Sequence, residues 1–259
     1  MKRFMAVMTA AVSVFAGFLA QPAAAADRMV LTVFAAASLQ AAMERAGALW
    51  TEANPHCEIL YNFDSSGTLK TQIEEGAECD LFISAARKPM DALEEAGLID
   101  RATRIDLLEN KVVLAVPPEN PAGIRYFRDL GTDRLSMIAL GNSDVPAGTY
   151  AREILENAGL WDKLNGEKRI SFASNVTEVA LQVREGAVDC GIVYATDAAT
   201  HGLTVVAGPP AGTLKTPVVY PAAVLSRSAR GEEARDFLRY LQSPEARKIF
   251  ISIGFTPAR

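Results

Sequence analysis

The sequence predicts an α/β protein built from two lobes. Expected strands and helices alternate through most of the 259 residues, which is typical of parallel sheets covered by helices. Four of the expected strands end in small or hydroxyl residues, and a helix begins directly after each one. The alternation changes near Lys111, where an apolar strand ends in Pro117 and Pro118 and a looser segment follows. A chain of this length accommodates two domains, so we expect two lobes, with a first change of lobe near this break.

The N-terminal part contains three strand–helix pairs. The strands are expected at 31–34, 58–63 and 80–84, and the helices at about 39–53, 68–75 and 90–96. Apolar residues recur at helical spacing in the first helix, at Met43, Ala46, Leu49 and Trp50. Gly76 and Gly97 occupy the position just past a helix end, where glycine is favoured.

The C-terminal part continues the pattern with longer loops. Its strands are expected at 111–117, 136–140, 169–172, 189–194 and 218–225, and its helices at about 147–157, 176–185 and 231–253. Pro221 interrupts the last strand, and Pro244 opens a second helix in the final segment. We expect the chain to cross between the lobes near 108–112 and 218–224. Residues 27–109 and 223–259 would then form lobe I, and 110–222 lobe II.

The N-terminus carries the three-part pattern of a secretory signal peptide. Lys2 and Arg3 precede an apolar run at 4–20, and small residues at 23–26 precede the expected cleavage after Ala26. A membrane anchor is the alternative, but the run is short for a spanning helix and a cleavage pattern follows it. The junction has no cysteine, which disfavours a lipoprotein. We therefore expect residues 1–26 to be removed and the protein to lie in the periplasm.

The charge of the mature chain restricts its partners. The full chain has a formal net charge of −5, and loss of Lys2 and Arg3 with the leader makes it −7. An acidic exported protein is a poor candidate for nucleic acid or an anionic membrane. Any bound anion must therefore be held by local dipoles against the overall field.

Cysteine and histidine give little sign of a metal centre. Cys57, Cys79 and Cys190 could include one disulfide, between Cys57 and Cys79, but we favour three buried thiols. The two histidines, His56 and His201, lie far apart in sequence, so we expect no zinc site.

The four strand ends predict a site for an anion. They fall within 33–39, 59–68, 138–148 and 170–176. Each leaves unpaired N–H groups at a helix start, where the helix dipole favours negative charge. Ligands in open α/β sheets bind beyond the carboxyl ends of the strands. One such junction is usually only a helix cap, but several junctions in both lobes indicate a shared site.

The first two junctions offer hydroxyl groups. Ser38 can cap its helix and also donate outward. Ser65, Ser66 and Thr68 form a cluster in which Gly67 allows close approach of the backbone to a ligand. Either Ser65 or Ser66 could point toward the ligand.

The later junctions offer backbone amides. Pro146 suits the first helical position and leaves the amide of Ala147 exposed. Asn175, with an acidic residue three positions later, fits a capping box that places the Val176 amide in the first turn. Tyr194 ends its strand and can add a phenol, although tyrosines in this position more often belong to the core.

The donor set also selects among anions. N–H and O–H donors without an acceptor suit a fully deprotonated oxyanion such as sulfate, molybdate or tungstate. Phosphate near neutral pH still carries a proton and needs an acceptor. Asp64 would provide one only if its side chain turned inward, and we favour an outward, capping orientation.

Six segments together resemble one family, the periplasmic molybdate-binding proteins of ABC transporters. They are 34–39, 65–69, 80–85, 145–151, 191–198 and 240–255. The resemblance spans nearly the whole mature chain. It implies a two-lobed type II periplasmic binding protein, with a mostly parallel sheet in each lobe and two crossover segments. It also implies capture of molybdate or tungstate between the lobes, delivery to a membrane ABC permease, no cofactor and a monomer.

Carried over to this sequence, the family's ligand contacts fall on five residues: Ser38, Ser66, Ala147, Val176 and Tyr194. No protein ligand to a metal cation is implied. Asp64 departs from the family pattern, which has a small neutral residue there.

Two other functions compete with this interpretation. A binding protein of the same fold could take sulfate, thiosulfate or an organic anion. An exported hydrolase would need a nucleophile with a positioned base or a metal. Ser38 and Ser66 have no evident histidine partner, and His56 and Cys57 would point to opposite faces of a strand. We therefore expect no catalytic residue.

Overall fold

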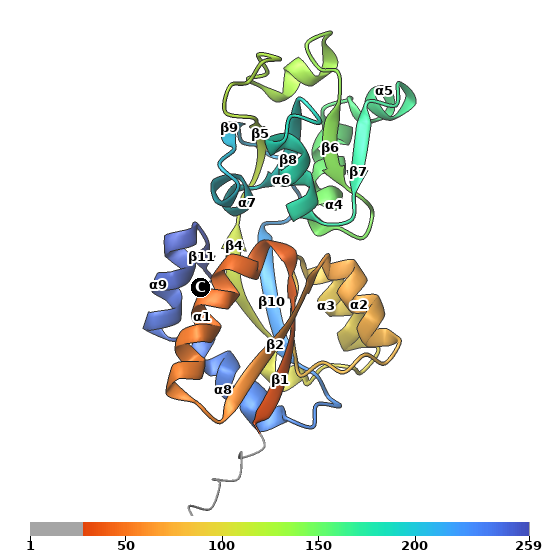
Figure 1. Cartoon of the computed structure of the whole chain (residues 1–259). Coiled ribbons are helices and arrows are strands. Elements are labelled where there is room, and N and C mark those ends of the chain that lie inside the picture. Colours follow the sequence, from red (N-terminus) through yellow and green to blue (C-terminus); the bar gives the residue numbers. More distant parts are fainter. Residues whose placement is uncertain (1–27, 259) are drawn as a thin grey trace, which may run out of the picture.

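The computed structural model describes residues 28–258, which form two lobes joined by two chain crossings (Figure 1). Each lobe is built around one sheet with helices packed on it. The expected signal peptide lies outside the described residues. Within 28–258, no helix has both the length and the apolar character needed to cross a membrane.

Lobe I contains a six-stranded sheet in the order β11-β4-β10-β3-β1-β2. Its strands are β1 (Met29–Ala36), β2 (Cys57–Asp64), β3 (Leu81–Ile83), β4 (Ile105–Asn110), β10 (Val218–Val224) and β11 (Thr256–Pro257). The first three are parallel, as expected for strand–helix pairs. β10 runs antiparallel between β3 and β4, because it enters the sheet from the other lobe. The sheet is therefore mixed.

Helices cover the lobe I sheet on both sides, with α1, α8 and α9 on one side and α2 and α3 on the other (Figure 1). They are α1 (Gln40–Ala53), α2 (Ser66–Glu74), α3 (Arg87–Glu95), α8 (Gly231–Leu241) and α9 (Pro244–Ile253), with short 3-10 helices η1 (Ala37–Leu39) and η2 (Arg101–Thr103). The ring of Trp50 meets Phe237 edge to face at 5.0 Å, which joins α1 to α8 in the core.

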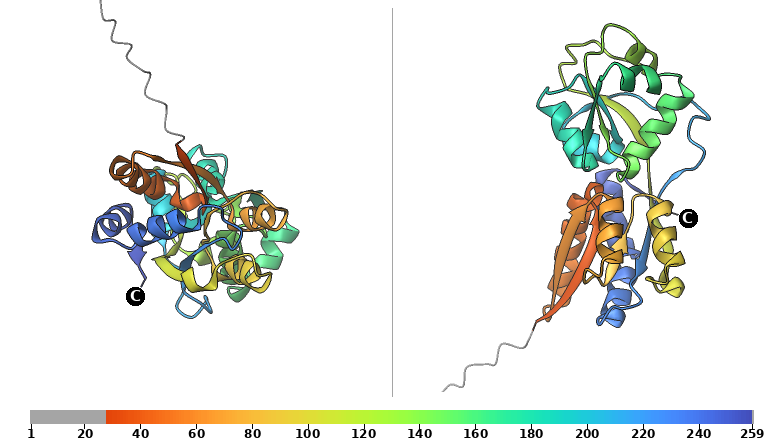
Figure 2. Two further views of the ribbon diagram at one scale, coloured as in Figure 1. Left: turned by 90° about the horizontal axis from the view of Figure 1, so that it is seen from below. Right: turned by 90° about the vertical axis from the view of Figure 1, so that its right-hand side faces the viewer.

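Lobe II contains a five-stranded mixed sheet in the order β7-β6-β8-β5-β9. Its strands are β5 (Val112–Val116), β6 (Ile138–Gly141), β7 (Ile170–Ala173), β8 (Cys190–Tyr194) and β9 (Thr204–Ala207). Its helices are α4 (Pro146–Asn157), α5 (Trp161–Gly166), α6 (Val176–Arg184), α7 (Ala195–Thr200) and the 3-10 helix η3 (Phe127–Gly131). The parallel core β7-β6-β8 directs the ends of its strands toward lobe I, as Figure 2 shows from the side.

The two crossings differ in length. Lys111 alone separates β4 from β5, whereas residues 208–217 connect β9 to β10. All of Val218–Val224 pairs within the lobe I sheet, so the expected division after residue 222 falls inside β10. A register shift between Tyr220 and Pro221 accommodates the proline within this central strand, because proline lacks the N–H that the ladder requires.

Candidate functional site

A small cavity of about 10 Å³ lies between the lobes, and helix starts from both lobes surround it. Its lining residues are Ala36, Ala37, Ser38, Asp64, Ser65, Ser66 and Ala85 from lobe I, and Val145, Pro146, Ala147, Val176 and Tyr194 from lobe II. All five residues expected to contact a ligand are among them. The structure thus brings together groups that are up to 156 positions apart in the sequence.

Ser38 lies in η1, directly after β1. Its hydroxyl is 2.9 Å from the phenol oxygen of Tyr220, a fully buried residue of β10. The side-chain amide of Asn110 donates to the same phenol oxygen at 3.2 Å and to Thr196 Oγ1 at 2.9 Å. Sequence reasoning missed Tyr220 and Asn110, because nothing local marks either residue as a neighbour of Ser38.

Ser65 and Ser66 have different roles. The hydroxyl of Ser65 accepts a hydrogen bond from the amide of Thr68 at 3.1 Å and lies 2.8 Å from the Thr68 hydroxyl, so it caps α2. The hydroxyl of Ser66 accepts from the Ala85 amide at 2.9 Å. That bond fixes the Ser66 oxygen and leaves its proton available for donation into the cavity. The geometry therefore favours Ser66 as the contact residue.

Two residues that line the cavity from lobe II carry amides at helix starts. Ala147 is the second residue of α4, after Pro146, and Val176 is the first residue of α6. Both are buried, and amides in these positions have no acceptor within their helices. The side chain of Asn175 caps α6, while the Glu178 carboxylate accepts from the amide of Ser174. The expected capping box is thus displaced by one residue, and the Val176 amide stays available.

Tyr194 completes the donor set from lobe II. Its side chain is 1% exposed, and its ring lies 5.7 Å from that of Tyr220, centroid to centroid. Burial raises the pKa of its phenol well above the ordinary value, so the group is a hydrogen-bond donor at neutral pH. Its hydroxyl makes one long contact, of 3.4 Å, to the Ala85 carbonyl across the interface between the lobes.

The cavity has no cationic side chain among its lining residues. Asp64 is the one acidic residue there. One of its carboxylate oxygens accepts a hydrogen bond from the Ser65 amide at 2.7 Å. The carboxylate therefore caps the turn before α2, but the residue also lines the cavity, so the expected outward orientation is not confirmed. The groups in this cavity that can attract an anion are hydroxyl groups, backbone amides and the positive N-terminal ends of helix dipoles.

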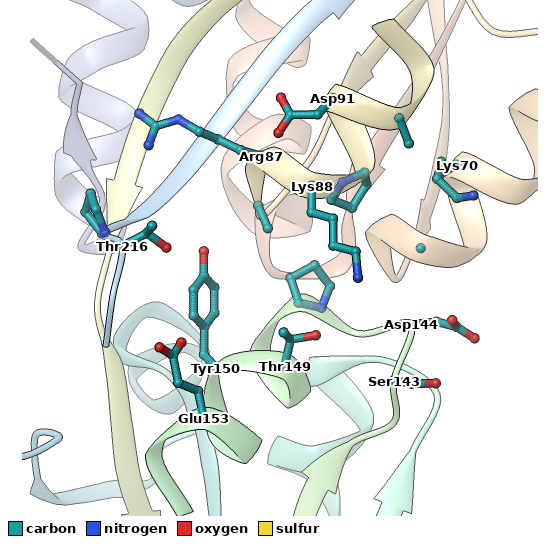
Figure 3. A pocket seen from close by; sticks show the side chains of 16 residues that line it. Lys70, Arg87, Lys88, Asp91, Ser143, Asp144, Thr149, Tyr150, Glu153 and Thr216 are labelled. Atoms are coloured by element: carbon teal, nitrogen blue, oxygen red, sulfur yellow. The ribbon is translucent and has the colours of Figure 1, made fainter. Parts of the chain in front are cut away.

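A larger cavity of about 580 Å³ opens beside the first one and also lies between the lobes (Figure 3). Lys70, Arg87 and Lys88 line it from lobe I, and Tyr150 and Glu153 line it from lobe II. Two of these cations already pair with carboxylates of their own lobe, Lys70 with Glu74 at 2.7 Å and Arg87 with Asp106 at 2.6 Å. This wider space forms the side of the cleft.

Clusters of potential metal ligands and the state of the cysteines were the other features considered in the sequence. Residues 28–258 contain no group of three or more histidine, cysteine or acidic side chains placed to hold a metal ion. Cys57, Cys79 and Cys190 are free and buried, which agrees with the favoured prediction of three thiols.

Comparisons with known proteins agree with this geometry. Residues 31–256 match the family model described as "Bacterial extracellular solute-binding protein". The molybdate-binding protein ModA of Escherichia coli K12 is 38% identical over 240 residues, which cover 90% of this chain and 91% of that protein. The protein of the same name from Haemophilus influenzae is 36% identical over 231 residues, covering 87% and 89% of the two chains.

A solved structure supports the same relationship. The periplasmic molybdate-binding protein of Azotobacter vinelandii superposes with a TM-score of 0.79 at 25% identity, covering 88% of this chain and all of that one. The chain therefore belongs to the bacterial extracellular solute-binding proteins, among the relatives of the molybdate-binding protein ModA.

Proposed function

We propose that this protein captures molybdate, and also tungstate, in the small cavity and delivers it to a membrane ABC permease. Convergence of neutral donors from both lobes on one cavity is the observation that carries the proposal. The contacts would be the hydroxyls of Ser38 and Ser66, the amides of Ala147 and Val176, and the phenol of Tyr194. The protein would act as an exported monomer in the periplasm, after cleavage of residues 1–26, without a cofactor and without catalysis.

The burial of the site indicates how an ion would enter. Ser66 and Ala147 are 0% exposed and Tyr194 is 1% exposed, so the two lobes must part before an ion can reach the donors. Lys111 and residues 208–217 are the two crossings at which the chain would bend. Closure would then place donors from both lobes around one ion and exclude water.

The donor chemistry favours a dianion that carries no proton. Sulfate, molybdate and tungstate share this property, and the size of the closed cavity would discriminate between them. The names of the relatives favour molybdate over sulfate. Phosphate near neutral pH carries a proton and needs an acceptor. Asp64 is the one acidic residue that lines the cavity, and only one of its carboxylate oxygens is bonded, to the Ser65 amide, so phosphate is included among the ions tested.

Thermal unfolding of the mature protein with molybdate, tungstate, sulfate and phosphate tests the proposal. A ligand that binds only the folded state at a thousand times its Kd adds about 4 kcal/mol of stability. For a chain of this size that shift raises Tm by roughly 8–16 °C. Large shifts with molybdate and tungstate and a small one with sulfate are expected. Equal shifts with sulfate would indicate a general oxyanion binder, and no shift with any of the four would refute the proposal.

A further inference from the structure

One hydrogen bond joins the backbones of the two lobes beside the anion cavity. The amide of Gly67, the second residue of α2 in lobe I, donates to the carbonyl of Asp144 at 3.0 Å. Asp144 lies in lobe II, in the loop between β6 and α4. Figure 3 shows this loop, with Ser143 and Asp144, on the side of the cleft opposite the helix that carries Lys70.

The contact leaves no room for a side chain at Gly67. A Cβ atom there would lie 2.4 Å from the Asp144 carbonyl oxygen and 2.9 Å from its Cα. Gly67 itself has an ordinary helical backbone within α2, which any residue can adopt. The approach of the other lobe, and no feature of its own backbone, is therefore what requires glycine here.

The loop that carries Asp144 has two internal hydrogen bonds, although Ser143 and Asp144 are exposed. The amide of Asp144 donates to the Asn142 side chain at 2.9 Å, and the amide of Val145 donates to the Asn142 carbonyl at 3.1 Å. Behind the loop, a Cβ on Gly148 would lie 2.2 Å from the carbonyl oxygen of Gly141. With its turn bonded internally and the backbone close-packed behind it, a retreat of the loop from a larger residue at position 67 would disturb these contacts.

The contact also lies next to two of the proposed ligand donors. Gly67 directly follows Ser66, and Asp144 precedes Ala147 by three positions. The separation of the Gly67 and Asp144 backbones therefore sets how closely the Ser66 hydroxyl and the Ala147 amide approach each other. We propose that the Gly67–Asp144 contact is the stop that ends lobe closure, which makes Gly67 a positioning residue for the anion site. This inference rests on the proposed binding of an oxyanion between the lobes.

Gly67→Ala tests the inference, with Gly166→Ala as its matched control. Gly166 lies in α5, and a Cβ there would meet nothing within 4 Å. Both substitutions replace a helical glycine with a better helix former, so neither should lower the unfolding temperature without ligand. A variant that cannot close completely populates the binding-competent form less, and its apparent Kd rises in proportion. We expect the Kd for molybdate to rise at least tenfold in Gly67→Ala, mainly through faster dissociation, and to stay unchanged in Gly166→Ala.

A second measurement reports closure without any ligand. Spin labels on Glu75→Cys in lobe I and Ala158→Cys in lobe II, both exposed positions, give the distribution of distances between the lobes. The native cysteines are buried and label poorly. We expect the shortest distances to be present in the wild-type background and absent with Gly67→Ala. The inference is overturned if Gly67→Ala has the same Kd, the same dissociation rate and the same distance distribution as the wild type. If the wild type binds no oxyanion, the proposed function fails, and the distance distributions alone decide whether Gly67 limits closure.

Discussion

Replacing Ser65 and Ser66 separately by alanine should separate folding from binding at adjacent positions. Ser65 caps α2, and loss of such a cap costs about 1 kcal/mol, or roughly 2–4 °C in Tm for a chain of this size. Ser66 accepts from the buried Ala85 amide, so Ser66→Ala leaves that amide without a partner at a cost of about 1–3 kcal/mol. Both variants should therefore be less stable than the wild type without ligand.

The two variants should differ in molybdate affinity. Ser66→Ala also removes a donor to a charged ligand, which is worth about 1.5–3 kcal/mol and corresponds to a Kd roughly 10 to 150 times higher. Ser65→Ala keeps all five proposed donors and should bind within about twofold of the wild type. Isothermal titration calorimetry with molybdate, together with urea unfolding of each apo-protein, measures both quantities. An equal loss of affinity in the two variants would refute the assignment of the Ser66 hydroxyl to the ligand.

Three further predictions concern buried side chains. Tyr194→Phe should raise the Kd for molybdate, measured by calorimetry, about tenfold or more. The Tm of the apo-protein should change little, because the one hydrogen bond that the phenol makes to the protein is long. An unchanged Kd would remove Tyr194 from the set of ligand donors. Burial raises the pKa of Asp197 to about 7, and its Oδ2 is buried with no partner among the described residues. The free energy of unfolding should therefore fall as pH rises from about 4, where the unfolded carboxyl ionises, to about 7, where the folded one does. Asp197→Asn should remove this penalty, which is about 4 kcal/mol at most, so urea unfolding should show the variant's advantage at pH 7.5 and little of it at pH 4.5. Cys57, Cys79 and Cys190 should give three thiols per chain after denaturation, and dithiothreitol should leave Tm unchanged; a reductant-sensitive Tm would contradict the free thiols of the structure.

Local patterns carried most of the fold prediction. Strand–helix pairs with an apolar strand and a clear helix start, such as β6 followed by α4 with Pro146 at its first position, lie close to their expected positions. The sequence did not reveal β4, because Ile105–Asn110 mixes acidic and apolar residues and is only partly buried. The short edge strands β9 and β11 have too few residues for a period to be recognised. Their pairing depends on neighbours that are distant in the sequence.

The site likewise contains some residues that local sequence patterns indicate and others that only the folded structure brings in. Ser38, Ala147 and Val176 were found because a helix start is a local feature with a physical reason to attract anions. Tyr220 lies 182 positions from Ser38, and only the folded sheet brings their hydroxyl groups together. The same holds for Gly67 and Asp144, whose contact exists only when the two lobes are close. Contacts of this kind depend on the order of strands in the sheet and on how closely the two lobes approach. The spacing of apolar residues along the sequence predicts neither.

The position of β10 in the sheet has a consequence for how the molecule is made. Lobe II is continuous in sequence from Val112 to Ala207, so a ribosome completes all its strands before Val218 is added. Lobe I must wait for β10, which joins β3 to β4 in the interior of its sheet. A polypeptide that ends before residue 218 lacks that strand and Tyr220 with it. Such a product therefore lacks both the strand that joins β3 to β4 and the hydrogen-bond partner of the Ser38 hydroxyl.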